Sequence, residues 1–249
     1  MPITDDIMAR ARRSDRAAIE TILSGSFPAV HRMTHALSGN SRTATLVERH
    51  VLQRAIRVMP RWRKGITPEN WFYHHALLVS REAAKRAPPA DRDLLVTAGP
   101  GGEPAYVAFV RALRGLPQQQ MEAFLLNHGE KLNSRLLGVA MDCSAGAAAT
   151  HLTAATDALR TISGASFNEV VPALERAYAA LTPPETVVRA TVAQQVSAGL
   201  WSVRLRRWFR RAVILTLLCV LAYVVWRWHA LLIQWFQVLR SRATTQSAS

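Results

Sequence analysis

The histidines have the spacing that comes closest to a catalytic or metal-binding group in this sequence. His31 and His35 are four residues apart, so on a helix they share one face, as two metal ligands would. No carboxylate or cysteine pattern downstream completes a site with them. His74 and His75 are adjacent and point about 100° apart on a helix, which rules out such a pair. We therefore expect solvated or half-buried histidines and no metal site.

Motifs for nucleophilic or phosphate chemistry are also missing from the sequence. There is no glycine loop that would cradle a phosphate and no nucleophile elbow. Gly99, Gly101 and Gly102 lie among prolines, as is usual in a linker. We expect neither an enzyme nor a cofactor.

A helix-turn-helix pattern occupies the second half of the chain. A helix that begins LPQQQMEAFLL is followed by a helix LNSRLLGVAM, a turn DCSAG and a helix AAATHLTAATDALRTI. A generic helical bundle explains the apolar positions equally well, so both interpretations stay open. The side chains expected between these helices are Leu132, Leu136, Val139, Ala140, Leu152, Ala155 and Leu159.

Apolar residues recur with the helical period of 3.6 along the whole chain, and no run alternates as a strand would. The pattern predicts an all-α fold of two small helical domains with a helical extension. The expected division is a domain over 1–87, a linker over 88–105, a domain over 106–164, an extension over 165–203, a membrane anchor over 204–242 and a polar tail over 243–249.

The anchor is expected because residues 212–226 form an uncharged run of 15 residues. Such a helix covers roughly 22 Å, and Arg227 and Trp228 would extend it towards the ~30 Å hydrocarbon core. A buried or interfacial helix is the alternative. The positive-inside rule predicts a single-pass protein of the cytoplasmic membrane with its N-terminal body in the cytoplasm. The arginines that would contact membrane lipids are Arg204, Arg206, Arg207, Arg210 and Arg211.

The chain is strongly basic, with 31 Lys and Arg against 17 Asp and Glu and a formal net charge of +14. Such a balance favours nucleic acid or an anionic surface as a partner. The excess lies in 1–87 and 165–249, whereas 88–164 is close to neutral. Two cysteines give no disulfide framework.

Several motifs in the helical segments match a known family in order and spacing. Gly39 precedes the second helix, Pro60-Arg61-Trp62 follows it, and Trp71-Phe72-Tyr73 and Lys85-Arg86 lie in and after the third. With these features residues 27–86 resemble region two of extracytoplasmic-function sigma factors. Residues 106–162, which include LRGLPQQQMEAFLL and the helices after it, resemble region four.

This resemblance implies a region that binds RNA polymerase core and melted promoter DNA, and a helix-turn-helix that contacts the promoter. The implied DNA contacts in the region two-like part are Arg61, Trp62, Arg63, Lys64, Trp71, Tyr73, Arg81, Lys85 and Arg86. Aromatic residues there would stack on unpaired bases, although a core position explains them too. The weaker contacts implied in the region four-like part are Ala149, Thr150, His151 and Thr153. The implied polymerase contacts are Glu48, Arg49, Leu52 and Gln53.

The chain also departs from the family. Members usually carry an acidic cluster where the second helix begins, but 43–46 read Thr-Ala-Thr-Leu and only Glu48 is negative there. The recognition helix is rich in alanine and has no arginine or asparagine placed to read a base.

Two functions therefore follow as hypotheses. The first is a membrane-tethered, sigma-factor-like regulator of transcription initiation that binds polymerase core and, weakly or in an altered way, promoter DNA. The second is a degenerate sigma-like scaffold at the inner face of the membrane, which binds a protein partner through 165–200 without recognising DNA.

Overall fold

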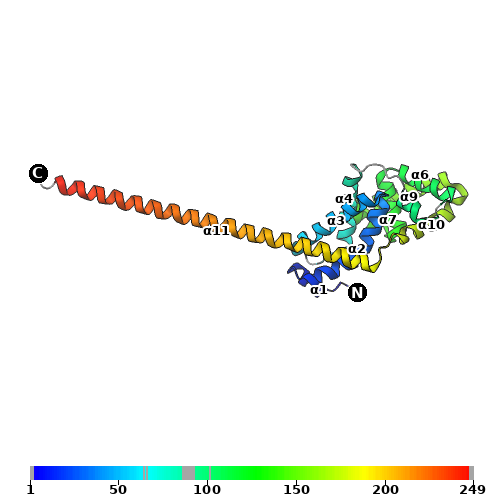
Figure 1. The fold of residues 1–249 in the computed structure, drawn as a ribbon. Helices are drawn as coiled ribbons and strands as arrows, with labels where there is room; N and C mark the ends of the chain where they lie inside the picture. Colours follow the sequence, from blue (N-terminus) through cyan, green and yellow to red (C-terminus); the bar gives the residue numbers. More distant parts are fainter. Residues whose placement is uncertain (1–2, 64, 66, 86–92, 101, 247–249) are drawn as a thin grey trace. The chain divides into compact units, whose positions relative to one another are not determined.

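The computed structural model describes residues 3–63, 65, 67–85, 93–100 and 102–246, and within α11 it leaves the side chains of 202–207, 210–211, 226–227 and 229–246 undescribed. Every regular element in this part of the chain is a helix, which confirms the all-α prediction. The helices form two compact units, Met1–Leu200 and Trp201–Ser249. Figure 1 shows the order of the elements along the chain.

Four helices make up the first part of the unit Met1–Leu200. They are α1 (Asp5–Arg12), α2 (Arg16–Ser38), α3 (Ser41–Val58) and α4 (Pro68–Ala84), with a short 3-10 turn η1 (Met59–Arg61) before α4. Side-chain oxygens of Asp15 and Asn40 accept hydrogen bonds from the first turns of α2 and α3. Gly39, which precedes the second helix of the sequence motif, ends α2 in the left-handed conformation, with φ at 63°.

Shorter helices make up the next part of the unit. They are α5 (Leu94–Ala98), α6 (Pro104–Gly115), α7 (Gln118–Glu130), α8 (Ser134–Met141), α9 (Ala145–Ser163) and α10 (Phe167–Ala180), with the 3-10 turn η2 (Gly164–Ser166) before α10. Helix α5 lies inside the stretch 88–105 for which the sequence predicted only a linker.

One hydrophobic core runs through both groups of helices. Helix α4 packs on α8, and α2 packs on α7 and α10 as well as on α3 and α4. The division of this unit into the domains 1–87 and 106–164 stays a prediction. One apolar residue expected between the helices of the helix-turn-helix pattern, Val139, is instead exposed.

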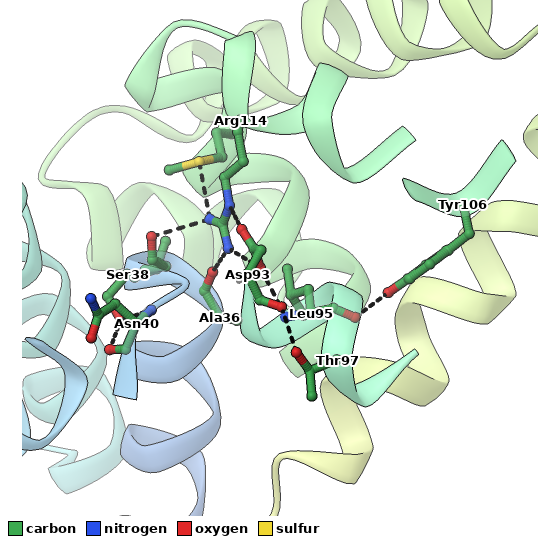
Figure 2. A network of polar contacts seen from close by, with 10 residues as sticks. Ala36, Ser38, Asn40, Asp93, Leu95, Thr97, Tyr106 and Arg114 are labelled. Atoms are coloured by element: carbon green, nitrogen blue, oxygen red, sulfur yellow. Dashed lines mark hydrogen bonds and ion pairs between the residues drawn. The ribbon is translucent and has the colours of Figure 1, made fainter. Parts of the chain in front are cut away.

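A polar network around Arg114 on α6 holds the end of α2 (Figure 2). The guanidinium lies against the Asp93 carboxylate, with Nε–Oδ2 at 2.6 Å and Nη2–Oδ1 at 3.1 Å. It also donates to the carbonyl oxygens of Ala36 at 2.7 Å and Leu37 at 3.1 Å. Carbonyls in the last turn of a helix have no partner within the helix, so Arg114 satisfies two that α2 would leave open.

Helix α11 (Glu185–Gln246) begins in the first unit and continues through the second. Within the first unit Val188, Val192, Val196 and Leu200 are buried in the core. Gly199 allows close packing, because a Cβ there would lie 2.9 Å from the Ile56 side chain. Residues 165–203 contain α10 and the first part of α11, and their separation from the rest as a helical extension stays a prediction.

The predicted membrane anchor is wrong. Among the residues that the structure describes, no helix combines the length and the apolar character that crossing a bilayer requires. The uncharged run of 15 residues is short for that purpose, and arginines border it on both sides. The orientation inferred from the positive-inside rule is withdrawn with the anchor. The side chains of Arg204, Arg206, Arg207, Arg210 and Arg211 lie outside the described residues.

Candidate functional site

Helices α8 and α9 are joined by the tight turn that the sequence predicted. Asp142 adopts the left-handed conformation, with φ at 59°, and ends α8. Gly138 permits the close approach of the turn, because a Cβ there would lie 2.8 Å from the backbone oxygen of Cys143. Ser144 begins α9 by accepting a hydrogen bond from the Ala147 N–H at 3.1 Å. These contacts fix the direction of α9 relative to α8.

The outer face of α9 presents hydroxyl and methyl groups. Thr150 and Thr153 are exposed, while Ala149 and His151 are half-buried. The Thr150 hydroxyl donates to the Gly146 carbonyl at 3.0 Å and keeps its lone pairs available. Such a face offers hydrogen-bonding groups to a base edge but little charge to phosphates.

The aromatic candidates of the region two-like part pack against one another. Trp62 is buried, with its ring centroid 5.3 Å from that of Trp71 and 6.3 Å from that of Phe72. Trp71 is half-buried and stacks on His75 at 3.9 Å. In this arrangement Trp62 belongs to the core, and only part of Trp71 can meet a base.

The basic candidates that the structure describes are either exposed or paired inside the fold. Arg61 and Arg63 are exposed near η1. Lys85 is exposed and pairs with Glu82 at 2.7 Å. Lys64 and Arg86 lie outside the described residues. The exposed arginines are therefore the ones placed to meet phosphates.

Arg81 is engaged inside the fold. Its Nε and Nη2 donate to the carboxylate of Glu122 on α7 at 2.9 Å and 2.6 Å. The side chain of Glu122 is 2% exposed, and Gln118 donates to the same carboxylate at 3.0 Å. These hydrogen bonds raise the pKa of Arg81 and so keep it charged. The pair ties α4 to α7.

Tyr73 takes part in a second buried pair. Arg32 on α2 donates to the carboxylate of Glu130 from Nε at 2.9 Å and from Nη2 at 2.8 Å. The Tyr73 hydroxyl donates to the same carboxylate at 3.4 Å. Burial raises the pKa of Tyr73, so the phenol stays protonated. The Tyr73 hydroxyl therefore also contacts α7.

The four polymerase candidates on α3 do not share one surface. Arg49 is exposed, whereas Leu52 is fully buried. Gln53 donates to Gln195 on α11 at 3.3 Å. Glu48 points inward, with a side chain 7% exposed. Their contact with polymerase stays a prediction, and in this arrangement Arg49 is the one placed to make it.

Glu48 instead joins the two histidines of α2. Its Oε1 lies 2.9 Å from Nδ1 of His31 and 3.0 Å from Nδ1 of His35. The Thr34 hydroxyl donates to the same oxygen at 3.2 Å. Burial raises the pKa of Glu48, but the contacts with His31 and His35 outweigh it and lower the pKa to about 2. The carboxylate is therefore ionised at neutral pH.

Sequence reasoning missed this cluster because the carboxylate comes from another helix. A signal was nevertheless present. Helices α2 and α3 pack together around the turn at Gly39 and Asn40. His31 lies eight residues before Gly39, and Glu48 lies eight residues after Asn40. Equal separation from a helical hairpin turn places two residues at the same level.

His75 gives a prediction about pH. Burial, followed by the charges of Arg54 and His74, lowers the pKa of His75 to about 4. An unfolded histidine has a pKa of about 6.5, so the unfolded chain takes up this proton first as pH falls. The stability that neutral His75 provides is complete above about pH 6.5 and is lost as pH falls towards 4. In urea denaturation, the free energy of unfolding of the wild type should exceed that of His75→Gln by less and less as pH falls from about 6.5 towards 4. If the difference in unfolding free energy between the two proteins stays constant with pH, this prediction is wrong.

No protein-family model and no curated protein matches this chain. The resemblance to sigma factors therefore rests on the motifs alone.

Proposed function

We propose that this protein is a sigma-factor-like regulator of transcription initiation that binds RNA polymerase core and contacts promoter DNA weakly. The observation that carries the proposal is the pair of helices α8 and α9, joined by a tight turn and presenting Thr150 and Thr153 on the second helix. A helix presented in this way can enter the major groove. The exposed Arg61 and Arg63 would add phosphate contacts.

Binding to polymerase is the direct test. The tagged full-length protein, folded by circular dichroism, should retain core polymerase at low salt. A folded protein that retains no polymerase would overturn the proposal. The test does not depend on DNA, so weak recognition by α9 does not obscure it.

The DNA contribution has its own prediction. The variant Arg61→Ala/Arg63→Ala should bind single-stranded promoter DNA more weakly than the wild type. Loss of two phosphate contacts should reduce the slope of log K against log salt by about 1.4, at ~0.7 for each contact. Fluorescence anisotropy at several salt concentrations measures this slope.

The matched control removes the same charge elsewhere. Arg111 on α6 and Arg176 on α10 are exposed, and Arg111→Ala/Arg176→Ala should leave the slope close to that of the wild type. If both double variants lose affinity equally, the attraction is a general effect of net charge, and Arg61 and Arg63 are not specific contacts.

A second function is favoured by the internal use of Arg81 and Tyr73. Side chains that the resemblance assigns to DNA instead form buried pairs with Glu122 and Glu130. A sigma-like body that binds a protein partner without recognising DNA fits this observation. The apolar faces of α10 and the start of α11 are themselves buried in the core, so a partner would meet the polar side of 165–200. Steeply salt-dependent binding of the native protein to promoter DNA would exclude this second function.

A further inference from the structure

We propose that His31, His35 and Glu48 bind a divalent transition-metal ion, for which zinc has the best-matched chemistry. Each residue offers one ligand atom, and the three atoms lie within 4.8 Å of one another. Two imidazoles and a carboxylate form a ligand set that zinc uses in proteins. The proposal does not rest on a role in transcription.

The two contacts of the Glu48 carboxylate are close to the separations that a metal requires, and the two imidazole ligand atoms lie within 4.8 Å of each other. Zinc binds nitrogen at about 2.0–2.1 Å and oxygen at about 2.0–2.2 Å, so ligand atoms of a tetrahedral site are roughly 3.3–3.4 Å apart. Glu48 Oε1 lies 2.9 Å from Nδ1 of His31 and 3.0 Å from Nδ1 of His35. An outward movement of roughly 0.3–0.5 Å at each contact makes room for the ion.

The His31 ring nitrogen is an unsatisfied group in this cluster. Although Nδ1 of His31 is 2.9 Å from the Glu48 oxygen, the contact lacks the direction of a hydrogen bond. Among the described residues this buried nitrogen has no hydrogen-bond partner. A buried polar atom without a partner costs free energy, and a metal ion accepting its lone pair removes that cost.

Neighbouring side chains orient the ligands. The Thr34 hydroxyl lies 3.2 Å from Oε1 of Glu48 and 3.1 Å from the carbonyl oxygen of His31, and its one hydrogen is shared between these two acceptors. The His31 ring meets the edge of Phe27 at 5.6 Å and the ring of His35 at 3.9 Å. Ligand-orienting contacts of this kind are part of metal sites in proteins.

The competing explanation is a single proton shared between an imidazole and the carboxylate. Nδ1 of His35 also lies 3.0 Å from the carbonyl oxygen of His31, so a hydrogen on this nitrogen could be shared between that carbonyl and Glu48. A metal ion uses both imidazoles at once. The experiment below separates the two explanations.

Three protein ligands leave one position of a tetrahedral ion for water. Structural zinc sites are closed by four protein ligands, whereas sites with three protein ligands keep the fourth position for water or another ligand. The His31 side chain is 19% exposed, and those of His35 and Glu48 are 10% and 7% exposed. The ion would therefore enter past His31 and lock α2 to α3.

The test uses the full-length protein, treated with a chelator and then titrated with Zn²⁺ or Co²⁺ alone. One ion should bind per chain, and Co²⁺ should give the visible absorption of tetrahedral coordination. At a free-ion concentration about 100 times Kd, the Tm should rise by roughly 5–10 °C. A folded wild type without saturable binding of either ion would overturn the proposal.

Variants locate the site. His31→Gln, His35→Gln and Glu48→Gln should each weaken binding by at least about tenfold. His50→Gln is the matched control, since His50 is an exposed histidine on α3, and it should bind as the wild type does. Equal affinity of the wild type and His31→Gln/His35→Gln would place the ion elsewhere and overturn the assignment.

Imidazole nitrogen resonances of the wild type settle the matter even if a variant fails to fold. Zn²⁺ should shift the ring nitrogens of two histidines together. If one imidazole is instead protonated at neutral pH and Zn²⁺ shifts none of these resonances, the cluster holds a proton and the metal proposal fails.

Discussion

Unfolding of the Arg114→Ala variant should require about 3 kcal/mol less free energy than unfolding of the wild type. The guanidinium is 23% exposed and holds Asp93, which is 21% exposed. Its loss leaves a partly buried carboxylate without its cation and removes charged donors from two carbonyls at the end of α2. Hydrogen bonds to charged groups contribute about 1.5–3 kcal/mol each, and not all of this is additive. Urea denaturation followed by circular dichroism measures the change.

The control for this variant lies on the same helix. Arg111 is exposed on α6, and Arg111→Ala should change the free energy of unfolding by less than about 0.5 kcal/mol. Arg114→Lys should recover only part of the lost stability. An ammonium group cannot donate to the carboxylate and to both carbonyl oxygens at once, as the planar guanidinium does. Equal effects of the two alanine variants would show that the network does not stabilise α2.

The Arg81→Ala variant should lose about 3–5 kcal/mol of stability. It leaves the Glu122 carboxylate, 2% exposed, without a cation. Removing one member of a buried ion pair is much more costly than removing both. The double variant Arg81→Met/Glu122→Leu should therefore regain most of the stability. Thermal and urea denaturation of the three proteins measure this.

Lys85 supplies the comparison from the surface. Its pair with Glu82 is exposed on both sides, at 66% and 59%, so Lys85→Ala should have little effect on stability. If Arg81→Ala is equally harmless, the pair with Glu122 is not formed in solution. A double variant that is stable but no longer binds promoter DNA would show that Arg81 also contacts nucleic acid.

The helices could be predicted from the sequence because their signals are local. The second helix, expected between Gly39 and Pro60, is found at Ser41–Val58, and the helix expected from AAATHLTAATDALRTI lies within Ala145–Ser163. The turn that begins at Asp142 and the stop at Gly39 follow from residues that tolerate the left-handed conformation. Caps, periodicity and turn residues need no knowledge of distant parts of the chain.

The roles of the polar residues could not be predicted in the same way. Arg81 meets Glu122 over 41 residues, and Arg32 meets Glu130 over 98. The sequence does not distinguish a charged side chain that is paired inside the fold from one that is free to contact DNA. The histidine cluster also needed the pairing of α2 with α3. The anchor was mispredicted because the apolar run was counted together with flanking residues that carry charge.

The long reach of Arg114 has a consequence for synthesis on the ribosome. The end of α2 is synthesised early, but the carbonyl oxygen of Leu37 accepts its hydrogen bond from Arg114, which lies 77 positions later in the chain. Glu122 and Glu130, the partners of Arg81 and Arg32, are made later still. Domains usually fold as they emerge, starting from the N-terminus. Here the nascent α1–α4 segment would emerge with unpaired arginines and an open helix end, so it should remain loosely folded and open to chaperones until α7 has left the tunnel.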